Sequence, residues 1–128
     1  MRFVYRHLVV LGPESARAAE AAECAGEQGK FWEYHDMLFE NWRGENAGAF
    51  SDANLKAFAA RLRLDGEQFA ACLDGRKYAS RVMEDTQAAR ALDIRSTPTV
   101  LVNGLRLVGL ADYGTYRRAI EEALRNVR

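Results

Sequence analysis

The dipeptide Asn103-Gly104 constrains the fold more than any other short stretch of this sequence. It separates two apolar runs, Thr99 to Val102 and Leu105 to Val108. Asn and Gly both tolerate a positive φ, and the tight turn that this allows matches the twist of two antiparallel strands. The sequence therefore predicts a β-hairpin over residues 99–108.

An amphipathic helix is predicted directly after the hairpin. Asp112 can cap its first turn, and Tyr116, Ile120, Leu124 and Val127 recur at about four-residue spacing. One face of this helix is therefore apolar, and we expect it to pack against the hairpin.

The N-terminal part of the chain predicts a strand followed by a helical block. Phe3 to Leu11 is rich in β-branched and aromatic residues and stops at Gly12-Pro13, which predicts a strand. Five helical segments follow within approximately residues 14–92, on the basis of apolar spacing and capping residues. They begin near Ser15, Lys30, Ser51, Asp65 and Lys77. The predicted order is strand, helical block, hairpin, helix.

Composition limits the classes of protein that this chain can be. It has 128 residues, and its 18 Lys and Arg balance its 18 Asp and Glu, so we expect one globular domain over residues 1–128 and no nucleic-acid partner. Uninterrupted apolar runs such as Leu8 to Leu11 are far shorter than the ~20 residues of a membrane span. We expect no membrane partner and see no signal peptide. Two histidines and two cysteines form no ligand cluster, so neither a metal nor a cofactor is expected.

Three stretches together resemble the DsbA-like family of thiol-disulfide oxidoreductases: AAECAGEQGKFWEYHDMLFEN, FAACLDGRKY and ARALDIRSTPTVLVNG. The resemblance extends from Arg2 to Arg128. It implies an α/β thioredoxin-like fold with a helical insertion, followed by the hairpin and C-terminal helix over approximately residues 97–127.

The chain also departs from that family. Members carry a Cys-x-x-Cys pair on the helix after their first strand, and this sequence contains no such motif. Residues 2–7 resemble the family's second strand, so the fold is expected to be N-terminally truncated, without the first strand and the active-site helix. We therefore expect no catalytic residue and no disulfide exchange by the chain as given. Whether it is an enzyme stays open.

Three interpretations of Cys24 and Cys72 are possible. They can be two buried thiols, a structural disulfide like the similar pairs that the resemblance suggests, or, least favoured, a redox pair. A structural disulfide would imply an oxidising, extracytoplasmic compartment. From the sequence alone the localisation is unknown.

Thr97 and Pro98 are the candidate substrate-binding residues. The resemblance implies a cis peptide bond before Pro98 and an extended peptide or protein substrate that pairs with the backbone of Thr97 as an added strand. The local sequence alone favours a trans proline that begins a strand, because only about 5–6% of X-Pro bonds are cis.

The expected truncation leaves the sheet incomplete. In the thioredoxin fold the first strand lies between the second strand and the hairpin, so its absence exposes unpaired backbone groups. We expect residues 3–10 to pair with the hairpin instead, or a homodimer to complete or shield the sheet. The leading function is a DsbA-like oxidoreductase module. The alternative is a redox-inactive module for peptide binding or oligomerisation, and a glutathione-dependent isomerase or transferase is disfavoured.

Two further rows of residues have structural interpretations. An aromatic row is expected in the core, with one of its tryptophans exposed: Phe31, Trp32, Tyr34, Phe39 and Trp42. An acidic row is expected to form a solvated face without a catalytic role: Glu20, Glu23 and Glu27.

Overall fold

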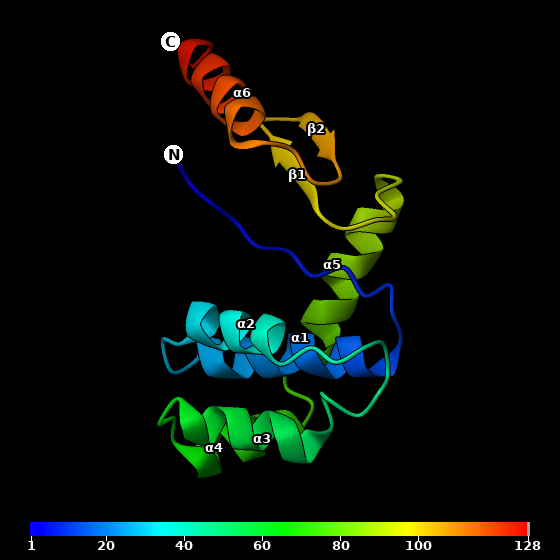
Figure 1. Cartoon of the computed structure of the whole chain (residues 1–128), viewed down its shortest axis with the longest axis vertical. Helices are drawn as coiled ribbons and strands as arrows, with labels where there is room; N and C mark the ends of the chain where they lie inside the picture. Colours follow the sequence, from blue (N-terminus) through cyan, green and yellow to red (C-terminus); the bar gives the residue numbers. More distant parts are fainter. Residues whose placement is uncertain (128) are drawn as a thin grey trace. The chain divides into compact units, whose positions relative to one another are not determined.

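The computed structural model describes residues 1–127 and contains six helices and two strands in that range (Figure 1). In chain order these are α1 (Pro13–Gly26), α2 (Phe31–Glu40), α3 (Asp52–Arg61), α4 (Gly66–Asp74), α5 (Ala79–Ala91), β1 (Thr99–Val102), β2 (Leu105–Val108) and α6 (Tyr113–Arg125). The chain divides into two compact units, Met1–Ala88 and the residues from Ala89 onward. That both units belong to one domain stays a prediction.

The first unit is built around α1, which contacts α2, α3 and α4. The face that α1 turns inward consists of small residues, including Ala21 and Ala25, which lets the neighbouring helices approach closely. Tyr34, Leu55 and Phe69 fill the space between the helices and are fully buried. Burial of a large apolar side chain contributes about 1.5–3 kcal/mol, so this cluster is the main source of the unit's stability.

Three helices begin at capping residues that the sequence predicts. The side chains of Ser51, Asp65 and Asp112 accept hydrogen bonds from backbone N–H groups three residues later, at 3.3, 3.1 and 2.7 Å. The predicted cap at Ser15 is wrong, because α1 already begins at Pro13. Proline suits the first turn of a helix, where its missing N–H group would have no partner.

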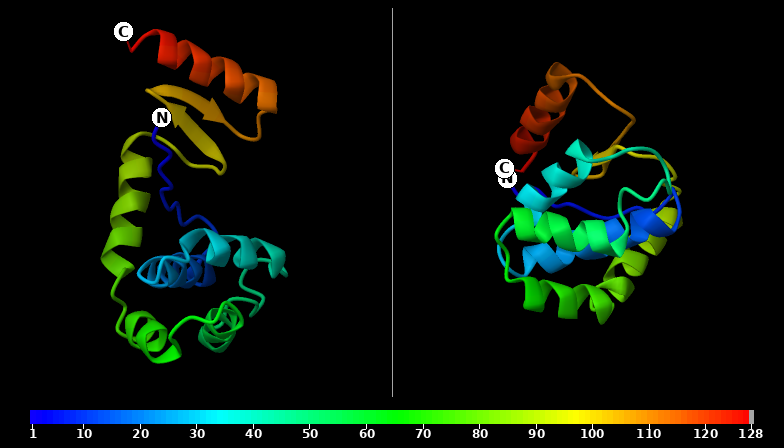
Figure 2. Two further views of the ribbon diagram at one scale, coloured as in Figure 1. Left: turned by 90° about the vertical axis from the view of Figure 1, so that its left-hand side faces the viewer. Right: turned by 60° about the horizontal axis from the view of Figure 1, so that its bottom comes forward.

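The second unit contains the hairpin and α6. β1 and β2 pair in antiparallel register, from Thr99 opposite Val108 to Val102 opposite Leu105. Asn103 and Gly104 both have positive φ, as the predicted turn requires. The last helix, α6, packs against β1 (Figure 2). It has no buried residue among its thirteen, because a two-stranded sheet is too narrow to enclose it.

The predicted N-terminal strand is wrong as a sheet element. Residues 1–10 form neither helix nor strand, and the sheet in the described residues contains β1 and β2 alone. The expected pairing of this segment with the hairpin, which belongs to the second unit, stays a prediction. Side chains of α5 take the place of a neighbouring strand: Asp85 accepts from the N–H of His7, and Thr86 accepts from the N–H of Val9, both at 3.1 Å.

The acidic row on α1 does not form a solvated face, so that interpretation is wrong. Glu20 is 2% exposed, and Glu23 and Glu27 are also largely covered. Each has a cationic or hydrogen-bonding partner from another segment, and such partners are what make the burial of a carboxylate tolerable.

The aromatic row of α2 is only partly in the core. Tyr34 is fully buried and donates its hydroxyl hydrogen bond to Leu55 O at 2.9 Å. Phe39, predicted as core, is 71% exposed. Trp32 and Trp42 are both exposed, whereas the sequence predicts that one of them is exposed.

Candidate functional site

The loop before β1 carries the two residues that the sequence proposes for substrate binding. The peptide bond between Thr97 and Pro98 is cis. Pro98 O accepts a hydrogen bond from Gly109 N at 2.8 Å, just beyond the end of the hairpin. Backbone groups of successive residues in a strand point to opposite edges. The N–H and C=O groups of Thr99 and Leu101 therefore point away from β2, and Thr97 precedes them across the cis bond.

This outer edge of β1 has no strand beside it. The sheet in the described part of the chain has two strands, so one edge of β1 is paired and the other is open. An open edge offers a row of unpaired N–H and C=O groups to any extended segment. We call the backbone of Thr97, Thr99 and Leu101 the outer edge.

Side-chain hydrogen bonds brace the loop that leads into this edge. The Thr99 hydroxyl donates to Ser96 O at 2.7 Å, which closes the turn around Pro98. Arg106 on β2 donates to Leu92 O at 2.6 Å, which ties the hairpin to the end of α5. The outer edge is therefore held in position by its own unit rather than by a long free loop.

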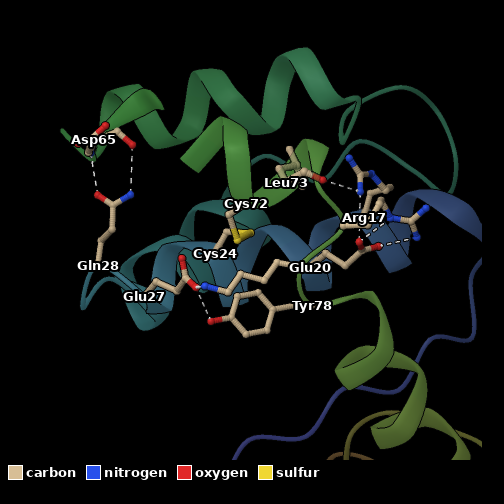
Figure 3. Close-up of a disulfide and its surroundings, with 11 residues drawn as sticks. Arg17, Glu20, Cys24, Glu27, Gln28, Asp65, Cys72, Leu73 and Tyr78 are labelled. Carbon is tan, nitrogen blue, oxygen red and sulfur yellow. Dashed lines mark hydrogen bonds and ion pairs between the residues drawn. A yellow bond between two sulfur atoms is a disulfide. The ribbon is translucent and has the colours of Figure 1, made fainter. Parts of the chain in front are cut away.

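The two cysteines are joined in a disulfide between α1 and α4 (Figure 3). The Cα atoms of Cys24 and Cys72 are 5.8 Å apart, and both residues are buried. No free cysteine exists in the described residues. Disulfide exchange needs an accessible sulfur and an attacking thiolate. This buried bond between two packed helices offers neither.

Polar groups tie α1 to α4 and to the segment after α4 on both sides of the disulfide. Gln28 and Asp65 exchange two hydrogen bonds, at 2.7 and 3.1 Å. Glu27 forms an ion pair with Lys77 and accepts from the Tyr78 hydroxyl at 2.8 Å. These contacts lower the pKa of Glu27, the hydrogen bond from Lys77 most of all.

Glu20 occupies the centre of a second polar cluster (Figure 3). It accepts from Arg17 Nη1 at 3.2 Å and from Arg76 Nε and Nη2 at 2.7 and 3.1 Å. Arg17 also donates to Leu73 O and to both carboxylate oxygens of Asp52. The hydrogen bond from Arg17 is the largest cause of the lowered pKa of Asp52. The only sign of this cluster in the sequence is the three-residue spacing of Arg17 and Glu20.

The described residues hold no cluster of three or more His, Cys, Asp or Glu side chains that could bind a metal. His7 pairs with Glu23 at 2.9 Å and His35 with Asp36 at 3.0 Å, and neither pair has a third ligand. Over the same residues, every helix is too short or too polar to cross a bilayer.

A hollow of about 330 Å³ lies at the turn end of the hairpin, between Val102, Leu105 and the last turns of α6. Its one titratable side chain is Glu122. Thr97 stands at the opposite end of β1, so this hollow is not part of the outer edge.

Comparison with known proteins places this chain among thioredoxin-fold proteins. A family model described as "Thioredoxin" matches residues 1–122. The crystal structure of a thioredoxin-like oxidoreductase from Silicibacter pomeroyi DSS-3 aligns with a TM-score of 0.78 and 24% identity, over 95% of this chain and 68% of that chain. This likeness shows the fold.

Curated relatives are longer proteins. The Na(+)/H(+) antiporter NhaA 1 of Salinispora arenicola (strain CNS-205) is 38% identical over 130 residues, a match that covers 100% of this chain and 19% of the antiporter. The Na(+)/H(+) antiporter NhaA of Herminiimonas arsenicoxydans is 37% identical over 128 residues, with 100% and 20% covered. The chain thus spans about a fifth of the length of these relatives. With the family model over almost all of its residues, the chain belongs to the thioredoxin family and has the DsbA-like fold, in which a helical block precedes the hairpin and last helix.

Proposed function

We propose that this chain is the peptide-binding part of a DsbA-like thiol-disulfide oxidoreductase module, and that its 128 residues perform no disulfide exchange themselves. The observation that carries the proposal is the outer edge. Its backbone donors and acceptors are unpaired, and they begin at Thr97 beside the cis bond to Pro98. An extended peptide can add to such an edge as a further strand, with affinity from main-chain hydrogen bonds.

The disulfide between the two cysteines supports the proposed absence of disulfide exchange. Exchange requires a thiolate that attacks the substrate disulfide, after which a second thiol resolves the mixed disulfide. Cys24 and Cys72 are the only cysteines in the sequence and already bond to each other inside the helical unit. No thiol is left to begin the reaction.

The curated relatives favour a second candidate, a binding module that serves a transport protein. They are named as Na(+)/H(+) antiporters, and the matched stretch is about a fifth of each. In this alternative the outer edge holds an extended segment for regulation or assembly rather than for redox chemistry. The DNA around the coding sequence discriminates the two candidates. An in-frame Cys-x-x-Cys motif upstream favours the oxidoreductase, and a membrane protein in frame without that motif favours the binding module.

Proline substitutions test binding at the outer edge. Leu101→Pro removes an N–H group that points away from β2, so the hairpin should tolerate it. Val100→Pro is the matched control, because its N–H group faces β2 and its loss should disrupt the hairpin. The probe is a short peptide of alternating Val and Thr, titrated by NMR against wild type and Leu101→Pro.

We expect the wild-type amides of Thr97 and of residues 99–101 to shift on titration and the shifts to be lost in Leu101→Pro while the hairpin signals persist. An N-methylated version of the peptide should not bind. Equal binding by wild type and Leu101→Pro would refute the proposed edge. Turnover in an insulin-reduction assay would refute the proposed absence of disulfide exchange.

A further inference from the structure

The chain around the cis bond to Pro98 is cationic. Residues 89–111 contain three arginines, Arg90, Arg95 and Arg106, and one carboxylate, Asp93, whereas the whole chain has a net charge of +0. All four residues belong to the second unit and are exposed. A molecule that approaches Thr97 therefore meets an excess of positive charge.

Arg106 adds its charge to the loop before Thr97. It lies on β2 opposite Leu101, and its guanidinium donates to Leu92 O at 2.6 Å. Leu92 directly precedes Asp93, so this guanidinium lies beside the same short loop that carries Arg95. Neither Arg106 nor Arg90 forms an ion pair with any of the described residues.

Arg95 is held only weakly by its partner. Its Nε lies 2.6 Å from Oδ1 of Asp93, but the two side chains are 83% and 75% exposed. Water and salt weaken an ion pair between exposed side chains, so such a pair contributes little to stability. Arg95 can therefore exchange Asp93 for the carboxylate of a bound molecule at little cost.

Thr97 lies two residues after Arg95, and its backbone forms no hydrogen bond with the described residues. An extended peptide advances about 3.3 Å per residue. A side chain two places along the peptide from the residue that pairs with Thr97 is therefore within reach of the long side chain of Arg95.

We propose that Arg95 makes this loop selective for acidic peptides, which are extended segments with an Asp or Glu within two residues of the residue that pairs with Thr97. The inference rests on the peptide binding proposed above and names the class of peptide. A guanidinium binds a carboxylate through two parallel hydrogen bonds, which a lysine of the peptide cannot accept. Arg90 and Arg106 attract the same negative charge and speed its approach.

A basic peptide meets the opposite situation. Asp93 is the one carboxylate of the loop, and it is already paired with Arg95. A lysine that bound Asp93 would displace Arg95 and bring a further cation toward Arg90 and Arg106. We therefore expect basic peptides to bind more weakly than neutral ones.

Three peptides test the selectivity. They alternate Val with Glu, with Thr or with Lys, and each is titrated by NMR against the whole chain at low and at high salt. The shift of the Thr97 amide reports binding. We expect the Glu peptide to bind about tenfold or more tightly than the Lys peptide at low salt, with the Thr peptide between them. High salt should narrow the gap, because it screens exposed charges.

Arg95→Glu should abolish or reverse this order. Arg125→Glu is the matched control, because it makes the same change of charge in the last turn of α6. The last turns of α6 line the hollow at the turn end of the hairpin, whereas Thr97 stands at the other end of β1. The control should therefore keep the wild-type order.

The outcomes separate this inference from the proposed function. Equal binding of all three peptides would leave the proposed peptide binding intact and overturn the acidic selectivity. A preference for the Glu peptide that survives in Arg95→Glu would overturn the role of Arg95. Absence of binding by all three peptides would refute the proposed function, and this inference with it.

Discussion

Arg76 forms two hydrogen bonds with Glu20: Nε lies 2.7 Å from Oε1 and Nη2 lies 3.1 Å from Oε2. Glu20 is almost completely buried on α1, and Arg76 lies in the turn between α4 and α5. Parallel hydrogen bonds from a guanidinium to a carboxylate are the strongest type of charged pair in proteins. This contact therefore fixes where the chain leaves α4.

Removal of Arg76 and removal of Arg17 should destabilise the helical unit to different degrees. Arg76→Ala leaves Glu20 with Arg17 as its remaining cation and should cost about 1–3 kcal/mol. Arg17→Ala should cost more, because Arg17 also holds Asp52 and Leu73 O. Urea unfolding of both variants measures the order. A larger loss for Arg76→Ala would contradict the cluster as described. Arg43→Ala, in an exposed loop, is the control and should stay close to wild type.

Loss of the disulfide should lower the stability of the same unit. The bond closes a loop with a sequence separation of 48. In the chain-entropy model a loop of that size stabilises the folded state by about 4 kcal/mol. The double variant Cys24→Ala, Cys72→Ala should show this loss in urea unfolding. Native wild type should take up no alkylating reagent until it is both reduced and unfolded. Rapid alkylation of the unreduced native protein would show that the cysteines are not bonded.

Acid should reduce stability through Glu27. Its pKa in the folded protein is lowered from the ordinary value of 4.5, mainly by the hydrogen bond from Lys77 and then by that from Tyr78. A carboxyl whose folded pKa is lowered contributes stability above its unfolded pKa and loses that contribution as the pH falls through the folded pKa. Glu27→Gln should therefore be less stable than wild type at neutral pH, and the difference should shrink below about pH 4.5.

The control for this experiment is Glu33→Gln, at an exposed position on α2. Its stability should run parallel to that of wild type across the whole pH range. A constant difference between wild type and Glu27→Gln from neutral pH to pH 3 would contradict the role given to Lys77 and Tyr78, because ~1.5 pH units below the unfolded pKa the carboxyl is protonated when unfolded.

Thr86 should protect one specific amide. Thr86→Val keeps the shape of the side chain but removes the hydroxyl that accepts from Val9 N. The amide of Val9 should then exchange with solvent faster, and the free energy of unfolding should fall by about 1–3 kcal/mol. Hydrogen exchange by NMR measures both effects. The amide of His7, which donates to Asp85, is the internal control and should keep its protection.

The parts of the fold that the sequence predicts well are those with local causes. Asn103-Gly104 specifies the turn through its own φ angles, and Ser51, Asp65 and Asp112 cap helices through contacts three residues away. These interactions need no information about the rest of the chain.

The N-terminal segment was predicted incorrectly because a strand is defined by its neighbour. Phe3 to Leu11 has the composition of a strand, yet the partners of its backbone are Asp85 and Thr86, nearly eighty residues away. Nothing in the local pattern specifies side chains as partners. The sequence pattern indicates an extended chain and cannot tell which groups will bond to it.

The acidic row on α1 fails for a related reason. The spacing of Glu20, Glu23 and Glu27 correctly places them on one face of the helix, but burial depends on cations from elsewhere. Arg76 and Lys77 approach from the segment after α4, and His7 from the N-terminal segment.

At the candidate site, Thr97 and Pro98 could be chosen only through the family resemblance, since the local sequence allowed an ordinary strand.

The link between Cys24 and Cys72 also turns the intervening chain into a closed covalent ring that contains α2, α3 and the loop between them. Arg43 in that loop is exposed and is therefore a natural site for trypsin. A single cut there would open the backbone without releasing either piece. The nicked protein would gain only the mass of one water and stay in one piece until a reductant separates the two fragments.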